Sequence, residues 1–387
     1  MTLRELDVYA RLPQRVVSAD GVFLALEDGR RVLDLYGGHC VNTLGAGDAG
    51  LERALAAQWR ELSFATNLVH TGARERFLAA FGANLPPGDW RLFLSNSGAE
   101  ANENALKAAF ASARPARRAV VAFEGAFHGR TAAAAAVSAG HGSGPYPNSP
   151  FEVRRVPLTD ARRIRAAIDA DVAAVLLEPI QSLAGVVPFA PELLRELRVW
   201  TREAGALLLF DEVQTGNGRL GPPWASQALG VVPDGFTTAK GAAGGLPIGI
   251  TVLAEHVAVR VGRDHFGSTF GGGPTVLAAA TEVASRIGAP GFAAGVETAS
   301  RALCAAVLSR AGRRLFRAVR GRGLLLGLLL ADGVGASEAQ ALLLEAGVLV
   351  GTSADPGVLR ANPPLTFTVE HARLVERALD SLSIPVA

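Results

Sequence analysis

The chain has 387 residues, of which 49% are apolar and 19% charged, and its formal net charge at neutral pH is +2. This balance is typical of a globular enzyme with a large core, built as two domains or as one α/β unit with an appendage. So small a net charge, with no basic block that contains interleaved aromatic residues, argues against a nucleic acid or an anionic membrane as partner.

The N-terminal segment and the two cysteines bear on the cellular compartment. Arg4, Glu5 and Asp7 precede any apolar run, so we expect neither a signal peptide nor a membrane anchor. Apolar runs such as residues 323–331 are too short to span a bilayer. Cys40 and Cys304 lie far apart, without the spacing of metal ligands, which predicts no metal site and fits a reducing cytoplasm.

The first predicted element is a hairpin over residues 21–37, in which "EDGR" is the turn signal. From about residue 90, short apolar runs alternate with amphipathic helical patterns. Such alternation predicts βαβ units, and hence an α/β fold with a mostly parallel sheet that binds ligands at the carboxyl ends of its strands. The expected strands cover residues 90–96, 119–125, 171–179, 206–213, 235–241 and 248–255, and the expected helices include residues 99–113 and 191–204.

The C-terminal third has a different pattern. A long helical stretch after about residue 275 leads into apolar runs at 321–333 and 347–353 and a final helix at 370–382. We therefore expect an N-terminal segment (1–45) that contributes to a small α+β domain (281–387), and a large domain between them (46–280).

Polar residues occur where several of these elements meet. Ser97, Gly98 and Ala99 open the helix after the first of these strands, where free N–H groups and the helix dipole could hold a phosphate. The alternative is an ordinary N-cap. In "FEGAFHGRT", Phe127 offers a flat face and Arg130 a carboxylate-binding fork. A single histidine in such a turn more often has a structural role than that of a general base.

Asp211 and Lys240 end two further strands. Asp211 follows five apolar residues, and a buried carboxylate there needs a partner, either a cationic pyridine nitrogen or an arginine. Lys240 is one of only two lysines, beside Lys107, in a chain whose other basic residues are arginine. Because a desolvated lysine can lose its proton and attack a carbonyl, whereas arginine cannot, Lys240 is a candidate Schiff-base lysine, the alternative being an ordinary surface lysine.

Three candidates lie toward the C-terminus. Ser268 and Thr269, in the glycine-rich loop "GSTFGGGP", suit a second phosphate contact or a surface turn. Arg360, just before a Pro-Pro pair, could bind a carboxylate. Taken with the preceding residues, these form the set typical of a pyridoxal-phosphate enzyme that acts on amino acids.

The sequence resembles the class III (subgroup II) aminotransferases of PLP fold type I, above all the acetylornithine and succinylornithine aminotransferase group. The family's motifs occur in order over nearly the whole chain, among them "SNSGAEANENALK", "AFHGRT", "DEVQTGNGRLG", "TTAKGAAGGLPIG" and "LRANPPL". The resemblance implies a pyridoxal 5′-phosphate cofactor and a large domain with a mostly parallel sheet. It also implies a homodimer with shared active sites.

The resemblance further implies roles for individual residues. Lys240 would form the Schiff base and move a proton, and Asp211 would pair with the pyridine nitrogen. Gly98 and Ala99 would hold the phosphate, and Phe127 would stack on one face of the ring. The other implied cofactor contacts are Val213 and Gln214 on the opposite face and the O3′ side, and Thr269 on the phosphate of the neighbouring subunit.

For the substrates, Arg130, with Ser268 close by, would bind the α-carboxylate of the acylated ornithine, and Arg360 that of glutamate or 2-oxoglutarate. Several positions depart from the family's pattern, and two of them bear on the substrate. Leu183 stands where many relatives carry a Glu thought to cover the second arginine, and His39 stands where ornithine δ-aminotransferases carry a Tyr. His39 is a candidate substrate contact, with structural packing as the alternative.

These residues predict a transaminase that moves the distal amino group of N2-acetylornithine or N2-succinylornithine to 2-oxoglutarate in arginine biosynthesis. Alternatives within the class are an aminotransferase of lysine biosynthesis acting on a carrier-linked aminoadipate semialdehyde, and an ornithine, GABA or broad ω-transaminase. From other classes, a PLP-dependent decarboxylase or aminomutase shares the cofactor residues. A catalytically silent scaffold would have lost Lys240 or Asp211.

Overall fold

The computed structural model describes residues 3–113, 117–140 and 149–382. Its largest sheet has seven strands in the order β4-β12-β11-β10-β7-β5-β6. Only β12 runs against its two neighbours, so the prediction of a mostly parallel sheet is confirmed. The strands are β4 (Trp90–Ser95), β5 (Ala119–Phe123), β6 (Glu152–Val156), β7 (Val172–Leu177), β10 (Leu207–Asp211), β11 (Gly235–Thr238) and β12 (Gly249–Ala254).

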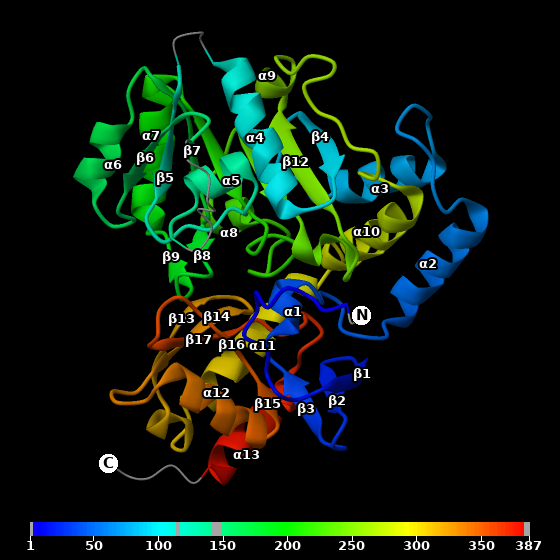
Figure 1. Ribbon diagram of the computed structural model, residues 1–387, viewed down its shortest axis with the longest axis vertical. Coiled ribbons are helices and arrows are strands. Elements are labelled where there is room, and N and C mark those ends of the chain that lie inside the picture. The colour runs from blue at the N-terminus through cyan, green and yellow to red at the C-terminus, as the bar shows by residue number, and fades with distance from the viewer. Residues whose placement is uncertain (1–2, 114–116, 141–148, 383–387) are drawn as a thin grey trace.

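Helices cover this sheet, and its central strands are therefore apolar throughout. Every residue of β5 and of β7 is buried, as expected for parallel strands with packing on both faces. Figure 1 shows α4, α5, α6 and α7 gathered around the sheet, with α2, α3 and α10 at its β4 end. These elements are α2 (Ala49–Glu61), α3 (Gly72–Gly82), α4 (Gly98–Ser112), α5 (Ala132–Val137), α6 (Ala161–Ala167), α7 (Pro191–Ala204), α8 (Ala225–Leu229), α9 (Glu255–Ala258) and α10 (Pro274–Ile287).

Local sequence signals fix the ends of these helices. Ser97 caps α4, since its side chain accepts the backbone N–H of Glu100. Helix α7 begins with Pro191, whose missing N–H costs nothing at this position, and ends at Gly205 with φ 65°. Helix α4 therefore starts directly after β4, and its free N-terminus faces the carboxyl edge of the sheet.

A second core joins the two ends of the chain. Strand β3 pairs in parallel with β15, so the N-terminal hairpin β2–β3 continues into a strand from the C-terminal third. Figure 1 shows these strands below the large sheet, with the short turn α1 (Gly37–Cys40) between the two parts. The domain boundaries given above stay a prediction. The elements are β1 (Val16–Asp20), β2 (Phe23–Leu26), β3 (Arg31–Asp34), α11 (Phe292–Val307), β13 (Phe316–Arg322), β14 (Leu325–Leu330), α12 (Ala336–Glu345), β15 (Val348–Leu349), β16 (Gly351–Thr352), β17 (Val358–Ala361) and α13 (Val369–Ser381).

Two short strands, β8 (Ile180–Gln181) and β9 (Val187–Pro188), form a ribbon between the two parts. In the part of the chain that is described, no helix is long and apolar enough to cross a membrane.

Candidate active site

A cavity of about 580 Å³ opens at the carboxyl edge of the large sheet. Strands β4, β10 and β11 each end at it, which brings together side chains from distant parts of the sequence. Nine of the predicted site residues line this cavity: Ser97, Gly98, Ala99, Phe127, Arg130, Asp211, Val213, Gln214 and Lys240.

Lys240 begins a short 3₁₀ turn two residues after β11 ends. The backbone next to Lys240 is held by Thr43, whose Oγ1 donates to Gly241 O at 2.8 Å. Thr43 packs so closely on Gly241 that a Cβ at this position would not fit. The Lys240 side chain makes no hydrogen bond or ion pair with any residue that the structure describes. Burial lowers the pKa of Lys240, and the charge of Arg360 adds to this effect, while Cys40, Asp211 and Glu178 oppose it. A lysine with a lowered pKa has more of the neutral, nucleophilic amine at neutral pH.

Asp211 is buried at the end of β10, and three donors hold its carboxylate. Val213 N donates to Oδ1 at 3.0 Å, while Asn102 Nδ2 and His128 Nδ1 donate to Oδ2 at 2.8 and 2.7 Å. Because a carboxylate accepts only, His128 must carry its proton on Nδ1. A carboxylate has about four acceptor sites, so one remains for a donor in the cavity.

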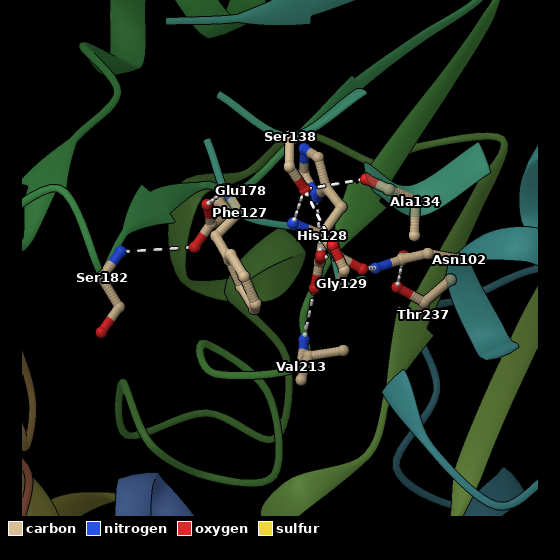
Figure 2. A network of polar contacts seen from close by, with 11 residues as sticks. Asn102, Phe127, His128, Gly129, Ala134, Ser138, Glu178, Ser182, Val213 and Thr237 are labelled. Carbon is tan, nitrogen blue, oxygen red and sulfur yellow. Dashed lines mark hydrogen bonds and ion pairs between the residues drawn. The ribbon is translucent and has the colours of Figure 1, made fainter. Parts of the chain in front are cut away.

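Figure 2 shows how this network continues behind the aspartate. Thr237 Oγ1 donates to Asn102 Oδ1 at 2.7 Å, which turns the amide nitrogen of Asn102 toward Asp211 and His128 O. Ser138 Oγ accepts the backbone N–H of His128 at 2.8 Å. Since all of these groups are buried, the orientation of the carboxylate is tightly determined.

The start of α4 supplies the anion-binding part of the cavity. Among the described residues, none accepts the backbone N–H of Gly98 or Ala99, so both donors are available at the positive end of a 15-residue helix. The Ser97 hydroxyl accepts from Glu100 N and donates to the Glu100 carboxylate, so it acts as an N-cap. The N-cap alternative raised for Ser97 is therefore also realised.

Two glycines allow close packing of the segments that form the cavity walls. Phe127 and Val213 both line the cavity, and a Cβ on Gly98 would lie 2.9 Å from Val213 Cγ2, so Gly98 permits close approach of helix and loop. Gly129 has φ 129°, and a Cβ there would lie 2.6 Å from Ala99 Cβ. Gly98 therefore lets the segment after β10 pack directly on the start of α4, and Gly129 does the same for the turn after β5.

A second buried carboxyl, Glu178, lies behind the Phe127 turn. It accepts Phe127 N at 2.9 Å and Ser182 N at 3.3 Å, and so ties that turn to the segment after β7. Burial raises the pKa of Glu178 to about 7, and Asp211 adds to the shift, whereas His128 and the two backbone donors oppose it.

The two arginines predicted to bind carboxylates lie in different surroundings. Arg130 is exposed at the cavity, its guanidinium carbon is 5.2 Å from the centre of the Phe127 ring, and it has no ion pair within the described chain. Arg360, on β17, is only 2% exposed and does not line the cavity. Its side chain contacts Thr352, Ser182 and Tyr36.

The structure places three other predicted residues outside the cavity lining. Ser268 Oγ accepts hydrogen bonds from Asn96 Nδ2 at 3.1 Å and from Gly271 N at 2.9 Å. Ser268 does not line the cavity itself, but it contacts Asn96, which does. Thr269 is exposed and lies outside the cavity lining of its own chain. His39 is exposed beside Tyr36.

Three residues at the site were not predicted from the sequence: Asn102, Glu178 and His128. Their signals were weak because each is an ordinary polar residue within a motif. The sequence favours a structural role for His128, and in the structure this residue contacts Asp211 directly. The position of Asn102 on the buried face of α4 is the signal that could have identified it, since a buried amide needs hydrogen-bond partners.

The residues present fit pyridoxal 5′-phosphate. Free N–H groups at the α4 start suit the phosphate, the space between Phe127 and Val213 suits a flat ring, and the remaining acceptor site of Asp211 suits a protonated ring nitrogen. Lys240, whose amine is not hydrogen-bonded or ion-paired to any described residue, suits attack on the carbonyl carbon of the cofactor.

Comparisons with known proteins agree with this chemistry. A family model described as aminotransferase class-III matches residues 8–382. An acetylornithine aminotransferase of Streptomyces coelicolor is 39% identical, covering 92% of this chain and 87% of that protein, and one of Brucella melitensis is 36% identical, covering 98% and 95%. Among solved structures, N-acetylornithine aminotransferase from Stenotrophomonas maltophilia is 30% identical with a TM-score of 0.81, covering 96% of this chain and 97% of that one. Ornithine aminotransferase from Toxoplasma gondii is 26% identical with a TM-score of 0.86, covering 97% and 91%.

Proposed function

The chain belongs to the class-III aminotransferases, and we propose that it transfers the distal amino group of N2-acetylornithine, or of the N2-succinyl analogue, to 2-oxoglutarate. The products are the N-acylated glutamate semialdehyde and glutamate, in arginine biosynthesis. The observation that carries the proposal is the single cavity in which Lys240, Asp211 and the start of α4 meet, with one arginine at its surface and a second buried beside it.

The cofactor is pyridoxal 5′-phosphate, which supplies an electron sink that stabilises negative charge on the substrate carbon. Gly98 and Ala99 would bind its phosphate through their backbone N–H groups, and Phe127 and Val213 would hold the ring between them. Gln214, buried and lining the same cavity, would contact the O3′ side.

Asp211 would pair with the ring nitrogen of the bound cofactor and so favour its protonated, electron-withdrawing state. Its own donors, Val213 N, Asn102 and His128, fix the orientation of the carboxylate at the cavity. His128 and Asn102 do not touch the reacting atoms, so we assign them as positioning residues.

Lys240 is the base that moves the proton. Because burial lowers the pKa of Lys240, its Nζ can accept the proton from the substrate carbon that bears the amino group. The same nitrogen can donate that proton again later in the reaction. The partly buried position of Lys240 also keeps bulk water from competing for this proton.

The two arginines divide the substrates between them. Arg130, exposed at the cavity, would bind the α-carboxylate of the acylated ornithine, so that the distal amine reaches Lys240. Arg360, buried beyond the cavity, would bind the α-carboxylate of glutamate or 2-oxoglutarate in the other half-reaction. We assign Ser268 and His39 as contacts near these two carboxylate sites.

The functional unit is a homodimer in which Thr269 reaches the phosphate site of the partner subunit. The surface around Thr269 supports this, because large apolar side chains are exposed beside it. Phe64 and Phe270 are 44% and 67% exposed, their ring centres are 5.7 Å apart, and Trp59 and Leu68 add further apolar surface. Phe270→Glu should yield monomers in light scattering with little bound cofactor; a dimer of unchanged stability would exclude this face as the interface.

We place the enzyme in the cytoplasm, with amino acids and 2-oxo acids as its only partners besides its second copy. Support for the reducing compartment comes from Cys40 and Cys304, which are both free thiols.

The proposal is tested by mixing the purified enzyme, with its cofactor bound, with single amino donors while the cofactor's absorbance is followed. The donors are N2-acetylornithine, N2-succinylornithine, ornithine, GABA and glutamate. We expect glutamate and an acylated ornithine to convert the cofactor much faster than ornithine or GABA, and the faster acyl donor identifies the branch. If glutamate converts it but neither acylornithine does, the substrate assignment is wrong.

A further inference from the structure

The buried arginine Arg360 has an unusual set of neighbours. Its Nε donates to Thr352 O at 2.7 Å, its Nη1 to Ser182 Oγ at 3.3 Å and its Nη2 to Tyr36 Oη at 3.0 Å. All three acceptors are neutral, and no carboxylate within the described chain forms an ion pair with this guanidinium. A buried charge without a counter-ion is costly, so Arg360 remains strongly attractive to an anion.

Counting donors gives the same result. A guanidinium has five N–H groups, and the three contacts above use one on each nitrogen. One N–H on Nη1 and one on Nη2 therefore have no partner among the residues described. Two N–H groups of one guanidinium are what a carboxylate needs for a bidentate contact. With 2% of its surface exposed, however, Arg360 cannot be reached unless a neighbouring side chain moves.

Tyr36 lies against Arg360, and His39 in turn lies against Tyr36. The Tyr36 ring centre is 5.5 Å from Arg360 Cζ and 4.4 Å from the His39 ring centre, and the Tyr36 hydroxyl is within 2.8 Å of a His39 ring nitrogen. The His39 side chain is exposed on one side and packs against Tyr36 on the other; this partial desolvation lowers the pKa of His39 to about 4, and the charges of Arg360, Lys240 and Arg130 add to the effect. The imidazole is therefore neutral at pH 7 and accepts the Tyr36 proton, while the Tyr36 oxygen accepts from Arg360.

A strained turn presents this pair of side chains. Gly37, Gly38, His39 and Cys40 have φ of 53°, 57°, 64° and 67°, so four successive residues are left-handed. For His39 and Cys40 this conformation costs roughly 1–2 kcal/mol each.

Hydrogen bonds on either side of the turn hold it in place. Asp34 Oδ1 accepts Tyr36 N at 2.8 Å and Gly37 N at 2.9 Å, and Asn362 Nδ2, two residues beyond Arg360, donates to Tyr36 O at 2.6 Å. Strain that the surroundings maintain in this way is typical of functional segments.

We propose that Tyr36 and His39 form a neutral cover over Arg360 that the carboxylate of a dicarboxylic substrate displaces, and that this cover sets the preference between dicarboxylic and monocarboxylic amino donors. The inference rests on the proposed function, in which Arg360 binds glutamate and 2-oxoglutarate. When an acylated ornithine is bound through Arg130, the cover stays in place, and Tyr36 keeps one N–H on Nη2 of Arg360 paired. When glutamate binds, its carboxylate takes the place of the Tyr36 hydroxyl, and the neutral pair moves aside.

The test compares Tyr36→Phe and His39→Ala with the unmodified enzyme, all with cofactor bound, in single half-reactions. Rates of cofactor conversion are measured against the concentration of glutamate alone and of N2-acetylornithine alone. Tyr9→Phe is the matched control, since it removes the hydroxyl of an exposed tyrosine.

Without the competing hydroxyl of Tyr36, we expect the apparent dissociation constant for glutamate to fall by about threefold to tenfold. This is the scale of part of one hydrogen bond to a charged group. The constant for N2-acetylornithine, and both constants of Tyr9→Phe, should stay within about twofold.

The opposite results overturn the inference. A rise in the glutamate constant of Tyr36→Phe would mean that the hydroxyl helps to bind the carboxylate, and no change would mean that it does not lie in its path. Equal changes for both donors would mean that the cover does not discriminate between them.

The second variant and the unmodified enzyme complete the test. His39 is exposed, so His39→Ala should fold even if Tyr36→Phe does not. This variant removes the group that holds the Tyr36 hydroxyl, so glutamate should displace Tyr36 more easily, and a glutamate constant that fails to fall also overturns the inference. The unmodified enzyme's reaction with N2-acetylornithine tests the proposed function separately, because the glutamate arm decides the inference even if the acylornithine proves inert.

Discussion

Replacing Thr237 by valine removes the outermost hydrogen bond of the network that holds Asp211. The Thr237 hydroxyl is fully buried and donates to Asn102 Oδ1 at 2.7 Å. Valine has nearly the same shape, so the substitution leaves a buried amide oxygen without a donor and little else. An unsatisfied buried acceptor costs about 1–3 kcal/mol, and we expect the free energy of unfolding to fall by that amount.

The same substitution should slow the reaction. Without its partner the Asn102 amide is free to turn, and Asp211 Oδ2 then loses the donor at 2.8 Å while His128 and Val213 N remain. One hydrogen bond to a charged group, partly replaced by the remaining donors, corresponds to about a tenfold fall in the rate of the glutamate half-reaction.

Thr251→Val is the matched control. Thr251 lies directly opposite Thr237 in the β11–β12 ladder, is equally buried, and donates to Ala101 O at 2.9 Å without contacting Asp211. Urea unfolding should show similar losses of stability in the two variants, whereas stopped-flow absorbance should show a slower half-reaction in Thr237→Val alone. Equal rate losses in both variants, or none in either, would refute the transmission from Thr237 through Asn102 to Asp211.

Three further substitutions address the base, the substrate contact and the pH dependence of stability. Lys240→Ala should reduce amino transfer to background while circular dichroism shows an unchanged fold, and retained turnover would contradict the assignment of the base. Arg130→Ala should raise KM for N2-acetylornithine by about tenfold to a hundredfold and that for glutamate far less, in steady-state assays; equal effects would contradict the division between the arginines. Burial raises the pKa of Glu212 from 4.5 to about 7, so the native state binds this proton more tightly, and the resulting stability is complete below pH 4.5 and lost as pH rises through 7. The free energy of unfolding should therefore fall by about 3 kcal/mol more between pH 5 and pH 8 in the unmodified protein than in Glu212→Gln, and parallel urea titrations would refute this.

The sequence predicted best the residues whose type is unusual for their position. Asp211 follows an apolar strand, and Lys240 is a rare lysine among glycines, so both stood out before any fold was known. The alternation of strands and helices placed them at one edge of a parallel sheet, and the structure brings them to one cavity. Even the reversed strand β12 was expected as a strand, although its antiparallel direction was not.

Residues whose importance depends on a distant partner were not predicted. Asn102 and Asp211 are 109 positions apart, and nothing local to either indicates that they share a hydrogen bond. The cover on Arg360 is hidden for a second reason. Sequence rules assign the left-handed conformation to glycine, so they anticipate it at Gly37 and Gly38 but not at His39, whose side chain the turn presents beside Tyr36.

One helix controls both ends of the proposed cofactor site. Gly98 and Ala99, at the start of α4, face the phosphate position, and Asn102, one turn later, holds Asp211 at the ring nitrogen position. An α-helix rises about 1.5 Å per residue, so these anchors are separated by a fixed distance of roughly 6 Å along the axis. The helix is itself held by the bond from Thr251 to Ala101 O and by alanines buried against β11 and β12. The geometry of α4 therefore fixes the distance between the proposed phosphate and ring-nitrogen contacts, and its packing on the sheet fixes their position.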